Sequence, residues 1–288
     1  MKVLVTGADG QLGRTLVNTA PAGVHLIAHS RAQLDISDRG SIESRVKEIE
    51  PEVIINCAAY TAVDRAENDE LFAQRVNADG PRYLAEAARQ VHARLIHVST
   101  DFVFDGCAST PYRPESTTNP LSIYGATKRA GEIAVLDVIP TRSVVVRTAW
   151  LYASVGNNFL QTMLRLLRER RQVRVVADQV GSPTATSSLA PALWKIVEQP
   201  QLAGIHHWTD SGVASWYDFA VAIAEEGTAR RMLPADVAVI PIVSREYPTA
   251  ARRPSYSVLD TTSLGCLEVP RAHWREWLRR VLSEMGNV

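Results

Sequence analysis

Hydrophobic positions occur in short, nearly continuous runs through the first half of the chain. Five runs have the length of strands, at residues 2–6, 24–28, 53–56, 94–99 and 143–147. Four segments in which apolar positions recur at helical spacing alternate with them, at residues 11–19, 41–49, 67–89 and 122–136. Strands that are apolar at almost every position are typical of parallel sheets covered by helices on both faces. The pattern therefore predicts an α/β fold built on a Rossmann-like, doubly wound parallel sheet.

The regular alternation weakens after about Trp150. Helical patterns recur at residues 158–171, 187–198 and 271–284, a strand is expected at residues 173–176, and proline-punctuated loops separate them. We therefore predict a first domain in residues 1–150 and a smaller C-terminal lobe in residues 151–288, partly interleaved with the first.

Composition narrows the function classes. The 31 basic and 31 acidic residues of this 288-residue chain cancel, so no global field favours a nucleic-acid partner. No apolar run approaches the ~20 residues of a membrane span, and we expect a cytoplasmic protein without a membrane partner. The three cysteines form no C-x-x-C pair and lie at no metal-ligand spacing, so neither disulfides nor a zinc site are indicated.

Three glycines spaced three apart follow the first predicted strand and open the first predicted helix. They are Gly7, Gly10 and Gly13. Glycine at these places permits a tight turn, a close approach of the backbone to a pyrophosphate and close packing of helix on strand. The pattern is G-x-x-G-x-x-G, and an ordinary strand–turn–helix connection is the alternative. The agreement of strand, loop and helix favours dinucleotide binding, with a nicotinamide cofactor bound by residues 1–150.

The end of the second strand bears on the choice between the two nicotinamide cofactors, because a carboxylate there binds a ribose hydroxyl whereas an arginine accommodates a 2′-phosphate. Ser30 and Arg31 lie at this point without an acid, which favours NADPH. NADH stays open, since Arg31 could equally be a solvated surface residue. Asp35 comes late for the ribose position and either contacts the adenine or precedes the next helix.

Tyr124 and Lys128 lie four residues apart and share one face of a predicted helix. Only four lysines and eight tyrosines occur in the chain, so chance rarely produces such a pair. An adjacent ammonium favours phenolate, and we expect it to lower the pKa of the tyrosine. The hydroxyl of Ser99 or Thr100, at the end of the fourth strand, would complete a triad for hydride transfer to a carbonyl, or would only cap a turn.

Together with further motifs, the glycine loop and the Tyr124–Lys128 pair make the chain resemble the extended short-chain dehydrogenase/reductase superfamily. Within it, the chain resembles the dTDP-4-dehydrorhamnose reductase family. The additional motifs are Leu34-Asp35-Ile36, residues 56–64, Val76-Asn77, residues 99–106, Tyr124-Gly125-x-x-Lys128, and residues 147–152, 158–159, 178–184 and 251–254. The motifs of the second half discriminate this family, because many sugar-nucleotide enzymes share those of the first half.

The resemblance implies a role for each matching residue. For the cofactor, the resemblance implies that Gly10, Gln11 and Leu12 contact the phosphates and that Asp35 and Ile36 lie near the adenine. It also implies that Ala58, Ala59 and Tyr60 lie along the cofactor and that Tyr124 and Lys128 contact the nicotinamide ribose. For the substrate, it implies that Thr100, Asp101 and the residue at position 102 contact the sugar and that Trp150 lies beside the hexose. Arg252 or Arg253 is implied to pair with the diphosphate. Thr100, Tyr124 and Lys128 are the implied catalytic residues.

Two positions depart from the family pattern. The family commonly has tyrosine where this chain has Phe102, so a hydroxyl expected near the sugar is missing. Cys57 replaces a usual alanine, and we interpret it as a small buried thiol. Some family members bind magnesium through acids of the C-terminal lobe, but we match no such acids and assign no metal.

The implied reaction is reduction of the carbon-4 ketone of dTDP-4-dehydro-L-rhamnose by NADPH, which forms dTDP-L-rhamnose for cell-surface polysaccharides. One alternative is another sugar-nucleotide epimerase or reductase of the superfamily. A second is a non-catalytic subunit like the regulatory chain of a methionine adenosyltransferase, although the intact triad favours an enzyme. The oligomeric state is left open, with a homodimer as the candidate. Trp208, Trp216, Trp274 and Trp277 are expected in the core.

Overall fold

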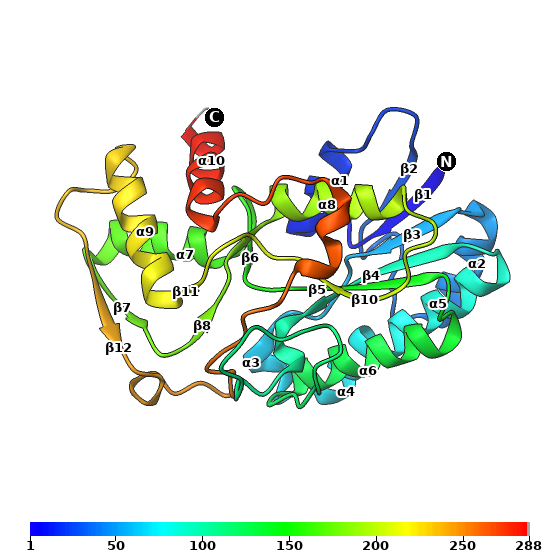
Figure 1. Cartoon of the computed structure of the whole chain (residues 1–288), viewed down its shortest axis with the longest axis horizontal. Coiled ribbons are helices and arrows are strands. Elements are labelled where there is room, and N and C mark those ends of the chain that lie inside the picture. Colours follow the sequence, from blue (N-terminus) through cyan, green and yellow to red (C-terminus); the bar gives the residue numbers. More distant parts are fainter. Residues whose placement is uncertain (287–288) are drawn as a thin grey trace.

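A six-stranded parallel sheet forms the centre of the protein in the computed structural model, which describes residues 1–286 (Figure 1). Its strands are β1 (Lys2–Thr6), β2 (His25–His29), β3 (Val53–Asn56), β4 (Arg94–Thr100), β5 (Ser143–Thr148) and β10 (Gly204–His207). Their order is β10-β5-β4-β3-β1-β2, and every neighbouring pair is parallel. The predicted α/β fold with a doubly wound sheet is confirmed.

Alternate residues of each strand enter two separate cores, because side chains of a strand point to opposite faces of the sheet. Val3 and Val5 pack with α1 (Gln11–Asn18) and α8 (Thr186–Val197). Leu4, between them, packs on the opposite face, in a core lined by α2 (Arg39–Ile49), α5 (Gly80–Gln90) and α6 (Ile123–Val138). Figure 1 shows these two helix layers on either side of the sheet.

The helix expected over residues 67–89 is divided, and that prediction was wrong. The structure has α3 (Val63–Ala66), α4 (Glu70–Gln74), a π-helix, η1 (Arg75–Asp79), and then α5. Pro81, in the first turn of α5, cannot donate a backbone N–H, so regular hydrogen bonding is interrupted here. The wider π-turn carries Asn77, which holds the loop after β3, since its side chain pairs with both the N–H and the C=O of Tyr60 at 2.8 and 3.0 Å.

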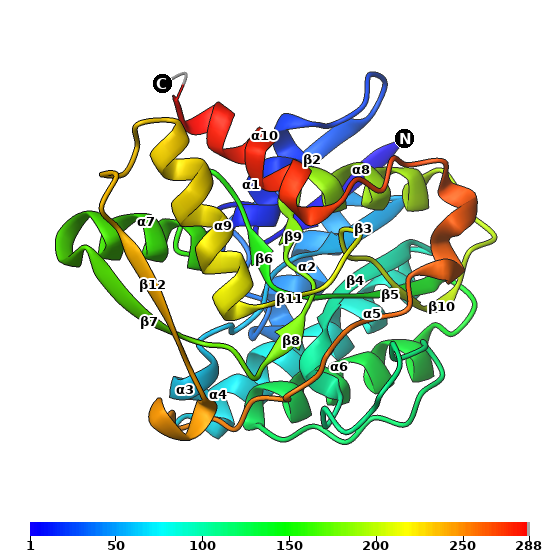
Figure 2. The ribbon, with the colours of Figure 1, turned by 60° about the vertical axis from the view of Figure 1, so that its left-hand side comes forward.

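The second half of the chain builds a further core away from the central sheet (Figure 2). Three helices surround it, namely α7 (Phe159–Arg170), α9 (Trp216–Ala229) and α10 (Trp274–Gly286). They pack with the parallel pair of β7 (Gln172–Val176) and β12 (Ala238–Ile242). Short pairs join β6 (Leu151–Tyr152) to β9 (Thr184–Ala185), and β8 (Val180–Gly181) to β11 (Ala214–Ser215). Single-turn 3-10 helices lie at η2 (Asp101–Val103) and η3 (Ser244–Glu246), and a longer one with a kink at Leu264 lies at η4 (Thr262–Leu267).

Strand β10 and helix α8 return to the central sheet from the second half of the chain. β10 lies beside β5, and α8 packs in the same core as α1. The strand was not predicted, because its sequence, Gly204-Ile205-His206-His207, contains a single aliphatic residue. The domain division near residue 150 stays a prediction.

Candidate functional site

A crevice opens where the strand order changes direction, between the loops that follow β1 and β3. Ligands of doubly wound sheets bind at such a point, beyond the carboxyl ends of the strands. A cavity of about 240 Å³ lies there. Its lining comprises Gly7, Asp9, Gly10, Arg31, Leu34, Asp35, Ile36, Cys57, Ala58, Ala59, Tyr60, Phe72 and Val76. Eight of the expected cofactor residues therefore face one cavity: Gly7, Gly10, Arg31, Asp35, Ile36, Ala58, Ala59 and Tyr60.

The glycine loop fits a pyrophosphate. Gly7 has φ +67°, and a Cβ there would lie 2.7 Å from the backbone nitrogen of Ala58. A Cβ on Gly13 would lie 2.3 Å from the carbonyl oxygen of Gly7, so helix α1 packs against the loop only because this residue is glycine. Within residues 1–286, no side chain caps the first turn of α1. The N–H groups of this turn are therefore available to an anion.

Three other residues expected to bind the cofactor, Gln11, Leu12 and Ser30, do not line this cavity. The Leu12 side chain is buried in the core. Gln11 extends toward the second half of the chain, where its side chain pairs with that of Asn158 at 2.8 Å. The Ser30 hydroxyl bonds to Gln33 at 2.9 Å and does not line the cavity.

A cation and an anion lie side by side at the far end of the crevice. Arg31 pairs with Asp35 at 3.3 Å and lies over the ring of Phe72. Although burial opposes ionisation, hydrogen bonds from Ser37 and Arg31 lower the pKa of Asp35, so this carboxylate stays charged. An arginine whose position is fixed in this way suits a 2′-phosphate, because the guanidinium donates several hydrogen bonds to phosphate oxygens.

The three predicted catalytic residues gather at the carboxyl edge of the sheet. Thr100 ends β4, while Tyr124 and Lys128 occupy the first two turns of α6. Ser122 begins that helix by accepting a hydrogen bond from the N–H of Gly125. A Cβ on Gly125 would lie 2.2 Å from the carbonyl oxygen of Phe102, so this glycine lets α6 approach the loop after β4.

Burial sets the proton affinity of the tyrosine in the direction opposite to the one expected. It raises the pKa of Tyr124 to about 12, although a hydrogen bond with Thr100 opposes the rise. The expectation that Lys128 lowers this pKa was wrong, because loss of solvent outweighs any attraction. Tyr124 is therefore a protonated phenol at neutral pH, the form that can give a proton to a developing alkoxide.

Asp101, next to Thr100, is also buried. Burial raises its pKa to about 6, while hydrogen bonds with Ser257 and Thr100 oppose the rise. Within residues 1–286 its Oδ2 has no hydrogen-bond partner, and neither does the hydroxyl of Thr148 on the neighbouring strand. Unpaired buried polar atoms are rare in native proteins, so these two atoms mark a place where a polar ligand would be satisfied.

Lys128 is only 2% exposed. Its ammonium group donates to the carbonyl oxygen of Val98 at 2.7 Å. Burial lowers its pKa to about 8, although the Glu132 carboxylate opposes this. Cys57, which lines the cofactor crevice, is a neutral thiol, because burial raises its pKa to about 12. The residue is half-buried and lines the cavity, so the expected small thiol beside the cofactor wall is less enclosed than predicted.

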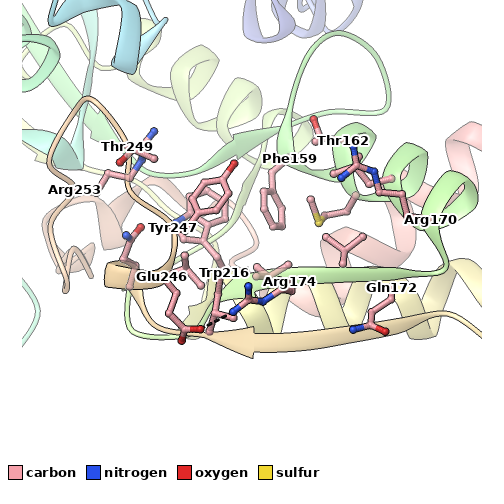
Figure 3. A pocket seen from close by; sticks show the side chains of 17 residues that line it. Phe159, Thr162, Arg170, Gln172, Arg174, Trp216, Glu246, Tyr247, Thr249 and Arg253 are labelled. Atoms are coloured by element: carbon pink, nitrogen blue, oxygen red, sulfur yellow. Dashed lines mark hydrogen bonds and ion pairs between the residues drawn. The ribbon is translucent and has the colours of Figure 1, made fainter.

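A larger cavity of about 700 Å³ lies in the second half of the chain (Figure 3). Its walls come from α7, β7, α9 and residues 242–253. Three arginines line it, Arg170, Arg174 and Arg253, against one acid, Glu246. The aromatic part of the lining consists of Phe159, Trp216 and Tyr247. Cations and aromatic faces together suit a ligand that carries phosphates and a base.

Trp150 connects this cavity with the catalytic residues. It follows β5, whose Thr148 lies opposite Thr100 in the register. Its ring stacks on that of Trp216, with centroids 3.5 Å apart and planes inclined by 5°. Trp150 has φ +49°, a conformation that costs a non-glycine residue energy and that often marks functional sites. All four tryptophans named in the sequence analysis were expected in the core, and Trp208 and Trp274 are buried there. Trp216 also lines the cavity, a role that the sequence analysis did not predict.

The two arginines expected at a diphosphate differ in position. Arg253 lines the large cavity and pairs with both oxygens of Asp64 at 2.7 and 3.1 Å, whereas Arg252 is exposed and lies outside the lining. Sequence analysis did not single out Arg170, at the end of α7, or Arg174, on β7.

No group of three or more His, Cys, Asp or Glu side chains within residues 1–286 is placed to hold a metal ion. Among the helices of the same residues, none has the length and apolar character needed to cross a membrane.

Comparisons with known proteins agree with this geometry. A family model described as "RmlD substrate binding domain" matches residues 1–287. A dTDP-4-dehydrorhamnose reductase of Streptomyces griseus is 44% identical over 279 residues, 94% of this chain and 90% of that protein. A Streptomyces antibioticus protein, named "Probable dTDP-4,6-dihydroxy-2-methyloxan-3-one 4-ketoreductase", is 41% identical over 290 residues, 99% of this chain and 96% of that protein.

Solved structures extend the comparison to the fold. The crystal structure of dTDP-4-dehydrorhamnose reductase from Bacillus anthracis in complex with NADP has a TM-score of 0.92 at 38% identity, and the match covers 98% of this chain and 99% of that chain. The protein described here therefore belongs to the dTDP-4-dehydrorhamnose reductase family of oxidoreductases, within the extended short-chain dehydrogenase/reductase superfamily.

Proposed function

We propose that this protein reduces the carbon-4 ketone of dTDP-4-dehydro-L-rhamnose to the alcohol of dTDP-L-rhamnose, with NADPH as the reductant. One observation carries the proposal. Tyr124, a half-buried phenol that stays protonated at neutral pH, interacts with Thr100 at the edge of the sheet where a dinucleotide crevice opens. Reduction of a ketone needs a proton donor at this place, because the oxygen of the carbonyl becomes an alkoxide.

When bound, NADPH supplies the hydride. The N–H groups at the start of α1 bind its pyrophosphate, and the Gly7 turn keeps this approach free of side chains. Arg31 binds the 2′-phosphate, which is the feature that favours NADPH over NADH. Lys128 is held near the crevice through Val98 and binds the nicotinamide ribose.

Thr100 and Tyr124 act on the carbonyl oxygen. The Thr100 hydroxyl donates a hydrogen bond that strengthens as negative charge develops there, and Tyr124 transfers its proton to the same oxygen. Asp101 interacts with the hexose through the oxygen that has no partner within residues 1–286. Thr100 and Asp101 are buried and Tyr124 is half-buried, which limits the access of water to the reacting carbon.

The large cavity binds the nucleoside diphosphate end of the substrate. Arg170, Arg174 and Arg253 supply guanidinium groups that suit two phosphates, and of these Arg174 is paired with Glu246 at 2.5 Å and Arg253 with Asp64 at 2.7 Å, so the phosphates compete with these carboxylates. Phe159 and Trp216 offer aromatic faces to the base, and Trp150 separates that end from the hexose. A dTDP-sugar therefore extends from the large cavity toward Thr100.

Turnover with defined components tests the proposal. Purified protein is mixed with NADPH, dTDP-4-dehydro-6-deoxy-D-glucose and the epimerase that converts this sugar to the L-rhamno form. We expect loss of reduced-nicotinamide absorbance in step with formation of dTDP-L-rhamnose, and slower loss with NADH. An isomerised sugar with NAD retained on the protein would instead identify an epimerase, and an unchanged sugar with no oxidation would favour a binding subunit.

A second substrate is supported by Phe102. Its ring meets that of Tyr124 edge-on, with centroids 5.8 Å apart, so no hydroxyl is offered to the sugar at this position. The relative from Streptomyces antibioticus is named as a ketoreductase for a different dTDP-linked sugar. The second candidate substrate is therefore a dTDP-linked 4-keto deoxyhexose that lacks the hydroxyl which a tyrosine at position 102 would contact. Comparison of kcat/KM for the two sugars discriminates between them.

A further inference from the structure

A buried network of polar side chains connects to Lys128, and its other members have no part in the proposed reaction. It runs from Thr6 at the end of β1 through Asn56 on β3 and His97 on β4 to Lys128 on α6. The first three residues are 0% exposed and Lys128 is 2% exposed. Buried polar chains of this kind are retained only when each member is satisfied, so the direction of every hydrogen bond carries information.

The direction is fixed at Asn56. The backbone N–H of Ala58 can only donate, and it lies 3.1 Å from Oδ1 of Asn56. The Thr6 hydroxyl donates to the same oxygen at 2.6 Å. The other terminal atom of the amide, Nδ2, is therefore a donor, and it lies 3.0 Å from Nδ1 of His97.

His97 consequently carries its proton on Nε2. Burial and then the charge of Lys128 lower the pKa of His97 well below its ordinary value, so the ring is neutral. A neutral imidazole has one N–H, and Nδ1 is occupied as an acceptor from Asn56. The remaining nitrogen, Nε2, therefore presents its N–H to Nζ of Lys128 at 3.4 Å.

We propose that His97 stabilises the unprotonated amine of Lys128 by donating this Nε2–H hydrogen bond, with Asn56 fixing the tautomer. An ammonium at Nζ would place its own N–H groups against Nε2–H. The other tautomer would remove that conflict but would place Nδ1–H against the amide N–H of Asn56. Either arrangement leaves two donors facing each other in a buried site, which is unfavourable by the full loss of a hydrogen bond.

The other groups near Lys128 do not cancel this effect. Glu132, one turn along α6, favours the ammonium, but its carboxylate is already shared by Arg147, Arg129 and Ser99. Tyr124 and Cys57 are protonated at neutral pH. Asp101, whose pKa is raised to about 6, is mostly ionised there, but Glu132 is the carboxylate that chiefly raises the pKa of Lys128. His97 is thus a positioning residue whose hydrogen bond acts on the lysine rather than on the substrate.

The scarcity of lysine allows a direct test. The protein has only four lysines, so labelling with ¹³Cε-lysine gives four titration curves, and a Lys128→Arg variant assigns the one of interest. We expect Lys128 to titrate at lower pH than Lys195, whose pKa is raised by its hydrogen bond to Glu198. In His97→Gln the midpoint of Lys128 rises by about one pH unit or more, since the glutamine oxygen can turn to face an ammonium.

His25→Gln is the matched control, because His25 is exposed at the start of β2 and lies outside the chain of hydrogen bonds. It leaves the Lys128 curve in place. An unchanged midpoint in His97→Gln would overturn the proposal. The tautomer gives a second test that needs no variant of the network: ¹⁵N-histidine spectra of the natural protein should show the His97 proton on Nε2, and a proton on Nδ1 would overturn the proposal as well.

Consequences for turnover rest on the proposed reductase activity, whereas the titration does not. If His97 acts through Lys128, the pH profile of kcat in His97→Gln moves in the same direction as the lysine curve, while KM for NADPH changes little. A protein without reductase activity would refute the proposed function and leave the titration result unaffected.

Discussion

Gly7 gives the sharpest test of the cofactor crevice, because two independent features forbid a side chain there. Its backbone has φ +67°, and an added Cβ would lie 2.7 Å from the nitrogen and 2.8 Å from the Cα of Ala58. Both atoms belong to the backbone of a residue that lines the crevice, so neither can move aside without displacing the cofactor wall.

The magnitude of the Gly7→Ala effect has two parts. The left-handed conformation costs alanine about 1–2 kcal/mol relative to glycine. Overpacking against a backbone adds typically about 1–3 kcal/mol. This clash displaces the loop after β3, which forms one wall of the crevice. We therefore expect NADPH affinity to fall at least about tenfold, which corresponds to about 1.4 kcal/mol.

Gly23 provides the matched control for the conformational part. It has φ +85°, but nothing lies within 4 Å of the position a Cβ would occupy. Gly23→Ala should therefore lose about 1–2 kcal/mol of unfolding free energy in urea and keep its NADPH affinity. Calorimetric titration of both variants with NADPH separates strain from the crevice. Natural NADPH affinity in a folded Gly7→Ala protein would refute the placement of the cofactor beside Ala58.

Three further predictions follow from other parts of the site. Tyr124→Phe removes the proton donor, so kcat should fall by about 10²–10⁴-fold with NADPH affinity nearly unchanged, and full turnover would exclude the role. Arg31→Ala should weaken NADPH binding by about tenfold and leave NADH binding unaltered, whereas an equal loss for both cofactors would contradict a 2′-phosphate contact. Burial raises the pKa of Asp210 to about 7, above its ordinary 3.8, so its contribution to stability is fully present below pH 3.8 and is lost as pH rises through 7. Asp210→Asn should accordingly be more stable than the natural protein at about pH 8 and lose this advantage toward about pH 5, and a pH-independent difference in urea unfolding would contradict that linkage.

Five of the six strands of the central sheet could be predicted, because the information for them is local. Apolar runs such as residues 2–6 and 53–56 mark buried strands directly, and the glycine spacing marks the turn between β1 and α1. Elements held by distant partners were missed. β12 contains Pro241 and, within residues 1–286, pairs only with β7. Helix α9 begins with a Ser215–Asp218 capping box in which aspartate replaces the usual glutamate.

The candidate site divides in the same way. The Tyr124–Lys128 pair follows from helical spacing, but its proton affinities do not, since the solvent around a side chain depends on the whole fold. Burial reversed the expected pKa change of Tyr124. Similarly, Trp216 and Arg174 reach the large cavity from elements whose approach no local pattern encodes.

The path of the hydride tests the central claim most directly. Protein is supplied with NADPH carrying deuterium at nicotinamide carbon 4, on the transferable face, together with dTDP-4-dehydro-L-rhamnose. The account predicts one deuterium at carbon 4 of dTDP-L-rhamnose for each NADPH oxidised. Tyr124→Phe should form the labelled product only at its residual rate of turnover. Deuterium that stays on the cofactor while the sugar is isomerised or unchanged would contradict it.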